Sequence, residues 1–122
     1  MGSIKIINTN LKSISFDFPE DSFGKLELQV ESESSILRPR EKDNRTALLK
    51  LNLNIRETKN NNINISVAAN VIFEFEEIPN DYNDVAKNEC TPMACTELFK
   101  KIDDILVVMG YPKFNLKIKN NS

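Results

Sequence analysis

The sequence contains no histidine and no tryptophan among its 122 residues. Without histidine, the Ser-His and Cys-His catalytic pairs and the histidine metal sites are excluded. The glycines, Gly2, Gly24 and Gly110, are too few and too widely spaced for a glycine-rich phosphate-binding loop. The composition therefore argues against an enzyme, and no cofactor and no metal site is expected.

Cysteine is also scarce, with Cys90 and Cys95 as the two examples. A secreted disulfide scaffold would carry more, and a zinc site would need further soft ligands nearby. Two reduced cysteines in a cytoplasmic protein are the preferred interpretation, although counting alone leaves one disulfide open. The sequence shows no secretory signal and no run of roughly 20 apolar residues. We therefore expect a cytoplasmic location without membrane insertion.

Charge of neither sign dominates, because 16 Lys and Arg residues stand against 18 Asp and Glu residues, a formal net charge of −2. This balance argues against a general nucleic-acid-binding protein, which needs a basic surplus. Neighbouring carboxylates occur at Glu74, Glu76 and Glu77 and at Asp103 and Asp104. Their polar surroundings offer no apolar pocket of the kind that acid–base catalysis needs, so they are interpreted as solvated surface charge.

The sequence does contain four segments in which apolar and polar side chains alternate, as in half-buried β-strands. They cover residues 13–18, 25–31 with a continuation towards 36, 47–56 and 62–76. The last segment places seven apolar residues on one face, namely Ile63, Ile65, Val67, Ala69, Val71, Phe73 and Phe75. One-sided strands of this length predict an antiparallel meander with one face covered and the other in water.

After Pro79 the apolar spacing becomes helical. Thr91-Pro92 predicts an N-cap followed by proline in the first turn, and Gly110 predicts the helix end. Between them lies an apolar stripe, formed by Ala94, Leu98, Phe99, Ile102, Ile105, Leu106 and Met109. A helix of about 18 residues is about 27 Å long, enough to lie across a four-stranded sheet. Val107 and Val108 lie outside the stripe. They are candidates for an oligomer interface, with ordinary exposed valines as the alternative.

The residues that follow the helix, 113–119, alternate again and predict a short final strand or an extended segment over the sheet edge. The chain as a whole, residues 1–122, is predicted to be a single α+β domain. Its architecture is a four-stranded antiparallel meander covered by one long C-terminal amphipathic helix.

This architecture and several local strings resemble the SecB family of protein-export chaperones. The string Lys12-Ser13-Ile14-Ser15-Phe16-Asp17-Phe18-Pro19 resembles the family's first strand, and Lys25-Leu26-Glu27-Leu28 resembles its second. Ile72-Phe73 falls where the fourth strand carries an Ile-Phe pair. The helix exit is glycine, an aromatic residue and proline, then Phe114-Asn115-Leu116, and it is similar to the family's Gly-aromatic-Pro-x-Leu-Asn-Leu. The resemblance covers roughly residues 10–118, and it rests on the order and spacing of these strings.

The resemblance implies an ATP-independent holdase without cofactor or catalysis. Such a protein is a homotetramer, a dimer of dimers, that binds unfolded polypeptides in apolar grooves. By match to the second strand, Leu26 and Leu28 are the first client-binding candidates. Phe18 and Phe23, which flank the short segment between the first two strands, come next. Each of these four residues, taken alone, is more typical of a core position than of a groove.

The sequence also departs from the family pattern. Residues 20–24 are shorter than the family's crossover loop, and its second helix and acidic tail have no counterpart. Asp17 matches one acid of the surface that docks the translocase ATPase, but the companion acid falls on Ser13. The Leu-x-Glu element of the same surface falls on Asn64 and Ser66. These departures weaken docking to a SecA-type ATPase more than they weaken the fold or client binding.

Three functions follow from these observations. The first is a SecB-like chaperone, either for exported proteins at large or dedicated to one client such as an antitoxin. The missing docking residues favour the dedicated form. The second is an enzyme or small-ligand protein of hotdog or cystatin-like type, which the apolar inner face of the fourth strand argues against. The third is an oligomerisation module without a client, which Val107 and Val108 fit equally well.

Overall fold

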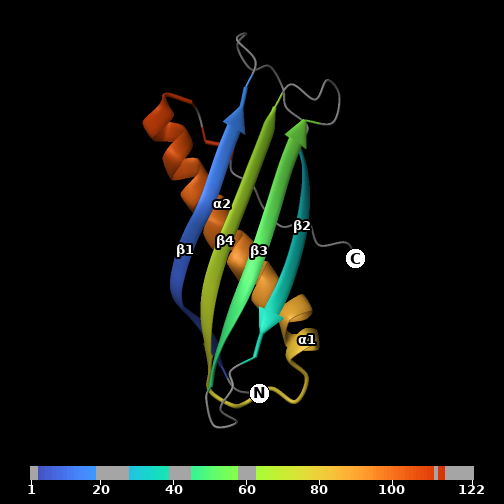
Figure 1. Cartoon of the computed structure of the whole chain (residues 1–122). Helices are drawn as coiled ribbons and strands as arrows, with labels where there is room; N and C mark the ends of the chain where they lie inside the picture. The colour runs from blue at the N-terminus through green and yellow to red at the C-terminus, as the bar shows by residue number, and fades with distance from the viewer. Residues whose placement is uncertain (1–2, 19–27, 39–44, 58–62, 112, 115–122) are drawn as a thin grey trace.

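The computed structural model describes residues 3–18, 28–38, 45–57, 63–111 and 113–114. Within these ranges one antiparallel sheet is crossed on one face by a helix (Figure 1). The strands are β1 (Ile4–Asp17), β2 (Leu28–Leu37), β3 (Thr46–Glu57) and β4 (Asn64–Phe75). The helical run consists of α1 (Tyr82–Val85), η1 (Ala86–Cys90) and α2 (Thr91–Met109). The predicted α+β class, with a four-stranded antiparallel sheet and a C-terminal helix, is confirmed.

The strands lie in the order β1-β4-β3-β2. Strands β2, β3 and β4 follow one another as the predicted meander, whereas β1 lies beside β4 at the far edge. When the strands are counted from β4 back to β1, the complete sheet has the strand order of a Greek key. The physical reason is the inner face of β4, which is apolar along its whole length. This face gives the apolar residues of β1 a continuous surface to pack against, from the pair Ile4 and Phe75 to the pair Phe16 and Ile65.

Strand β1 is longer than the segment 13–18 that the sequence predicts. Its pairing with β4 contains two register shifts, one between Ile6 and Asn8 and one between Leu11 and Ser13. Each shift inserts an extra residue and reverses the alternation of faces. The apolar residues of β1 therefore do not keep a period of two, and the first half of the strand is hidden from a search for simple alternation.

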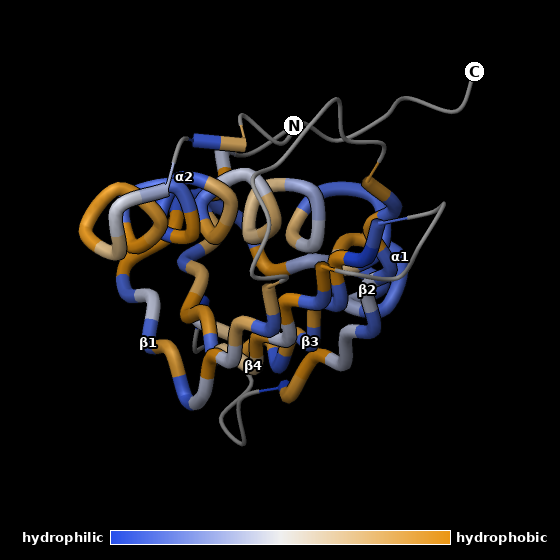
Figure 2. The backbone as a smooth tube through the Cα atoms, turned by 90° about the horizontal axis from the view of Figure 1, so that it is seen from above, coloured by the Kyte–Doolittle hydropathy of each residue, from blue (hydrophilic) through white to orange (hydrophobic). Residues whose placement is uncertain are grey.

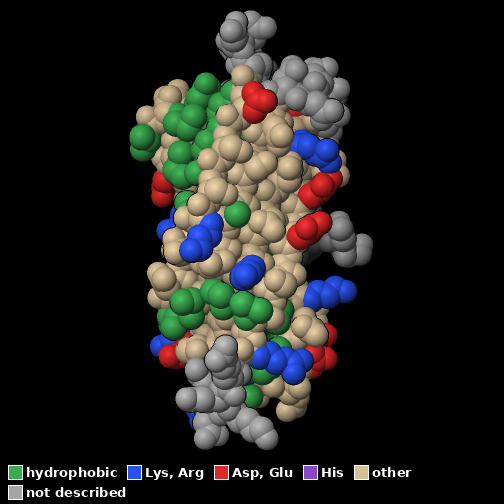
Figure 3. All heavy atoms as spheres, in the orientation of Figure 1, with side chains coloured by type: hydrophobic (Ala, Val, Ile, Leu, Met, Phe, Trp, Pro, Cys, Tyr) green, Lys and Arg blue, Asp and Glu red, His purple; other side chains and the backbone are tan. Residues whose placement is uncertain are grey.

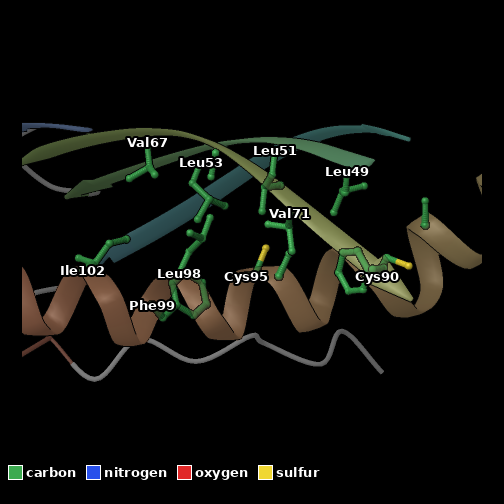
Figure 4. Close-up of a cluster of buried hydrophobic side chains, with 14 of the residues drawn as sticks. Leu49, Leu51, Leu53, Val67, Val71, Cys90, Cys95, Leu98, Phe99 and Ile102 are labelled. Carbon is green, nitrogen blue, oxygen red and sulfur yellow. The ribbon is translucent and has the colours of Figure 1, made fainter. Parts of the chain in front are cut away.

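The core lies between the sheet and α2. Every apolar residue predicted for the inner faces of β3 and β4 is buried. The helix contributes buried residues from one stripe, namely Ala94, Cys95, Leu98, Phe99, Ile102 and Leu106. Figure 2 shows the helical layer on one side of the sheet, and Figure 4 shows the labelled side chains meeting between the two layers. Met109, predicted for the stripe, is exposed instead, because the last turn of α2 extends beyond the covered part of the sheet.

The helix begins earlier than the Thr91 N-cap predicted from the sequence, and that prediction is wrong. The cap is Asp81, whose carboxylate accepts hydrogen bonds from the backbone N–H groups of Asn83 and Asp84. Pro92 lies inside the helical run, where it lacks an N–H and its ring crowds the preceding turn. The run accommodates it by widening into η1, where the N–H of Thr91 donates to the carbonyl of Ala86, five residues back.

The helix end agrees with the prediction. Gly110 adopts φ 92°, in the left-handed region that favours glycine. Its N–H donates to the carbonyl of Val107, and the N–H of Tyr111 donates to that of Leu106, which together form a Schellman motif. The strand or extended segment predicted at 113–119 lies mostly outside the described residues, since Lys113 and Phe114 alone are described there.

The two cysteines are both free and buried, so no disulfide joins them. Burial raises the thiol pKa of each from 9.0 to about 11, because the core solvates a thiolate poorly. At Cys90 the negative charge of neighbouring Glu89 adds to the same effect. The thiols therefore act as small apolar side chains of the core and are unreactive as nucleophiles.

Replacing Leu98, which is fully buried under the sheet, by alanine is expected to lower the free energy of unfolding by about 2–5 kcal/mol. The matched control is Val108→Ala on the same helix, whose side chain is 87% exposed. We expect the control to change stability by less than about 0.5 kcal/mol. Urea unfolding followed by circular dichroism measures both, and equal effects would contradict the placement of the stripe.

The folded protein is expected to react slowly with an aromatic disulfide reagent at pH 8, and urea is expected to release both thiols to rapid reaction. The thiolate is the reactive form, and its population in the folded state is held down by a pKa of about 11. Stability should also fall as pH rises from about 9 to about 11, because the unfolded thiols ionise first and draw the equilibrium towards the unfolded state. Rapid reaction of two thiols without denaturant would contradict this placement.

Candidate functional site

The inner face of β2 is the part of the sheet that the helical layer leaves largely open. Its register with β3 assigns alternate residues of β2 to this face, namely Leu28, Val30, Ser32, Ser34 and Ile36. Their partners on β3 are buried, whereas Val30 is 36% exposed and both serines are exposed. Leu28 and Ile36 are half-buried against the core. Strand β2 therefore presents an accessible row that is apolar at both ends and hydroxylated in the middle.

The sequence of β2 explains why this row stays open. Serines at 32 and 34 occupy positions where β3 and β4 carry leucine, valine or alanine, so little apolar surface there drives a helix to cover the strand. The helical run approaches β2 through α1 and η1. A hydrogen bond of 2.8 Å between the hydroxyls of Ser34 and Thr91 joins the two elements.

A groove of about 430 Å³ lies between β2 and the beginning of the helical run. Its lining residues are Ser32, Ser34, Ser35, Ile36, Asn83, Ala86, Lys87 and Thr91. Serine and threonine hydroxyls, an asparagine and one lysine supply the polar part of its wall, and Ile36 and Ala86 supply the apolar part. The groove and the open row of β2 form one continuous surface at this edge of the sheet.

The client-binding candidates from the sequence fall in two places. Leu28 begins β2 and is half-buried, opposite Glu57 of β3. Phe18 follows β1 at the other edge, with β4 and β3 lying between the two strands. Both lie at the same end of the sheet, about 14 Å apart if three strand spacings separate them. Phe23 and Leu26 lie outside the described residues.

Phe18 belongs to an aromatic cluster. Its ring centroid lies 5.5 Å from that of Phe16, 4.7 Å from that of Tyr111 and 6.1 Å from that of Phe114. The backbone N–H of Phe114 donates to a carboxylate oxygen of Asp103 at 2.8 Å, which fixes the chain after the helix exit against α2. The cluster joins the end of β1 to the end of α2 and leaves Phe18 half-buried.

Sequence reasoning missed Val30, Tyr111 and Phe114 as members of these surfaces. The signal for Val30 was present, because the apolar alternation of β2 stops at two serines and resumes at Ile36. Such an interruption is typical of a strand face without a complete cover. The contact between Phe18 and the helix exit links residues distant in sequence, and no local pattern predicts it.

The positions that match the family's translocase-docking surface lie on the opposite, outer face of the sheet. Asp17 is exposed at the end of β1 and pairs with Asn64, while Ser15 pairs with Ser66. Ser13 and Ser66 line a shallow hollow of about 490 Å³. At its β2 side the carboxylate of Glu31 accepts a hydrogen bond from the guanidinium of Arg56. This region is therefore polar, and part of its acidic charge is neutralised.

Val107 and Val108, the candidate oligomer interface, lie at the end of α2. They are 52% and 87% exposed, and exposed Met109 continues the same apolar tip. The structure contains one chain, so the valines remain an interface candidate.

The carboxyl of Glu76, after β4, has a pKa below its ordinary value. The backbone N–H of Ser3 donates to its Oε2 at 3.0 Å and the Ser3 hydroxyl at 2.9 Å, and the charge of Arg45 adds to the effect. Arg45 also donates to the backbone carbonyl of Glu76 at 2.8 Å. These bonds fasten the ends of β1, β3 and β4 together, which is a structural role.

The residues that the structure describes contain no group of three or more His, Cys, Asp or Glu side chains arranged to hold a metal ion. Over the same ranges, no helix combines the length and hydrophobicity that a membrane crossing needs.

Comparison with known proteins identifies the fold. No family model and no curated protein matches the sequence. Among solved structures, a SecB-like chaperone of Mycobacterium tuberculosis, Rv1957, in complex with a ChAD peptide from the antitoxin HigA1 (Rv1956), superimposes with a TM-score of 0.75. The sequences are 11% identical, and the match covers 96% of this chain and 90% of that one. A protein of unknown function from Streptococcus agalactiae matches with a TM-score of 0.55 and 12% identity, over 97% and 99% of the two chains.

Identity at this level establishes a shared fold. It agrees with the resemblance noted in the sequence, from the strand strings to the glycine that ends the helix. The chain therefore has the fold of the SecB-like chaperones.

Proposed function

We propose that this protein is an ATP-independent holdase that binds non-native polypeptide segments without catalysis. The observation that carries the proposal is the open inner face of β2 on a SecB-like fold. In the similar mycobacterial structure, a chaperone of this fold holds a peptide. The proposal includes a cytoplasmic location, which two free, buried thiols suit.

The shape of the candidate surface supports a polypeptide as ligand. Between α2 and the sheet the buried side chains are apolar, as with Val71 and Leu98, and the buried charged residue of the described ranges, Glu57, lies at the end of β3. This space therefore suits neither a substrate nor a small ligand. The row on β2 is long, shallow and partly apolar. Such a surface captures exposed apolar segments with little sequence preference, since the hydrophobic effect is non-directional.

We assign client contacts first to Leu28 and Val30, and then to Phe18 at the other edge. Phe23 and Leu26 extend the same proposal into residues outside the described ranges. Leu28, Val30 and Phe18 are apolar or aromatic side chains at one end of the sheet, and several weak contacts of this kind add up on an extended client.

A chaperone dedicated to one client is the second candidate function. The mycobacterial complex favours it, because that chaperone holds a peptide from an antitoxin. The outer face supports it as well. The positions matched to the translocase-docking surface carry Ser13, Asn64 and Ser66, and these supply no acidic charge beside Asp17. A general role in export is the alternative, with a SecA-type ATPase as the partner.

The purified protein is expected to suppress the aggregation of a chemically unfolded model protein without ATP. Val30→Asp should weaken client binding by about tenfold, because it removes an apolar contact and places a charge in the row. The control is Ile78→Asp, which adds the same charge at an exposed residue beyond the opposite end of the sheet. Light scattering during dilution from denaturant measures suppression. If the wild type suppressed the aggregation of no client, the chaperone proposal would be lost.

We further propose that Val107 and Val108 form a self-association surface, giving a dimer or tetramer. Val108→Glu is expected to reduce the mass measured by multi-angle light scattering, because it places a charge in the apolar tip. Thr96→Glu, at an exposed position of the same helix, is the matched control and should leave the mass unchanged. A wild-type protein that is monomeric throughout would refute this. Association without client binding would instead favour an oligomerisation module.

A further inference from the structure

An apolar row crosses the outer face of the sheet, at the end away from Asp17. Leu48 of β3 pairs with Leu37 of β2 on one side and with Ile72 of β4 on the other. On β1, Asn8 pairs with Ile72, and Ile7 sits in the register shift just before it. Leu37 is 47% exposed and Ile7 is 48% exposed, while the two central residues are partly exposed. Figure 3 shows the resulting band of hydrophobic side chains across the lower part of this face.

This row differs from every other row of the outer face in the described strands. The neighbouring rows carry asparagine, serine, alanine and charged residues, as expected for a face in water. On β1 the row is continued by Ile7, the extra residue of the register shift, whose exposed side chain lies next to the pair of Asn8 and Ile72.

The charge beside the row is basic. Along the strands, the next row towards Asp17 contains Lys50 between Ser35 and Asn70. Lys50 is exposed and makes no ion pair with any described residue, and the same holds for Lys12 in the second register shift of β1. On the other side of the row, Lys5 is paired with Glu74 at 3.1 Å. In Figure 3, Lys or Arg side chains lie directly above the hydrophobic band.

We propose that this row docks an amphipathic helix of a partner protein, with acidic side chains flanking its apolar stripe. A helix satisfies its own backbone hydrogen bonds, so it can lie flat on a sheet face where an extended strand cannot. The row runs across four strands, about 14 Å, which matches a stripe at i, i+4, i+7 and i+11. Lys50 lies about 7 Å from the row, within reach of a flanking carboxylate.

This partner would bind independently of the proposed client. The row lies on the sheet face opposite α2, whereas the open part of β2 faces the helical layer. A helix on the outer face leaves the inner face of β2 free. The protein would then hold a partner and a non-native segment together.

The test uses two labelled synthetic helical peptides with leucines at i, i+4, i+7 and i+11. One carries glutamates on both flanks of the leucine stripe, and the other carries lysines. Fluorescence anisotropy at low salt is expected to give about tenfold tighter binding of the acidic peptide, and salt should shrink the difference. Equal affinity for the two peptides would overturn the proposal.

Two variants locate the peptide. Lys50→Glu is expected to weaken the binding of the acidic peptide by about five- to tenfold. The control Lys100→Glu makes the same charge change on the exposed face of α2 and is expected to leave the binding affinity unchanged. Leu37→Ser removes exposed apolar surface and should weaken the binding of the acidic peptide by about fivefold, while the melting temperature of the protein stays unchanged. Identical affinities for Lys50→Glu and Lys100→Glu would overturn the assignment, as would dissociation of a wild-type oligomer by Leu37→Ser. Aggregation suppression by Lys50→Glu should match the wild type, which separates this test from that of the holdase.

Discussion

The structure depends on one interface, the contact between a single helical stripe and the continuous apolar face of β3 and β4. Both strands bury every second side chain along almost their whole length, and α2 supplies the matching surface from Ala94 to Leu106. Burial of apolar surface is the main source of stability in a domain of this size. The order of strands follows from it, because β1 packs where the apolar face of β4 is available.

The same interface leaves part of the sheet uncovered. One helix has a single apolar stripe, and a stripe that serves the two central strands leaves the outer ones partly open. On β1 the open part is closed near Phe18 by the aromatic residues after the helix exit. On β2 the two serines keep it open. The proposed client surface is thus a by-product of how far one helix reaches.

Much of the fold could be predicted from the sequence, because the alternation in β3 and β4 and the helical stripe are local patterns. The start of the helix could not be predicted, because Thr91-Pro92 is typical of a helix beginning. In the structure the helical run continues through this pair, and the wider η1 turn accommodates the proline. The first half of β1 was hidden by its register shifts. Of the candidate site, Leu28 and Phe18 were found through a resemblance. The serines that interrupt the alternation of β2 were a local signal for Val30, whereas Phe114 and Tyr111 required the spatial neighbours that only tertiary structure supplies.

The position of β1 beside β4 sets an order of events during synthesis. The strand that leaves the ribosome first pairs with the strand that leaves last. After Asp17 is made, roughly 50 more residues must be synthesised before its partner Asn64 exists. At ordinary elongation rates the wait is about two to nine seconds. During that interval Ile14 and Phe16 have no apolar surface to cover them. A nascent chain of this fold is itself, for a few seconds, an unfolded polypeptide with exposed hydrophobic side chains.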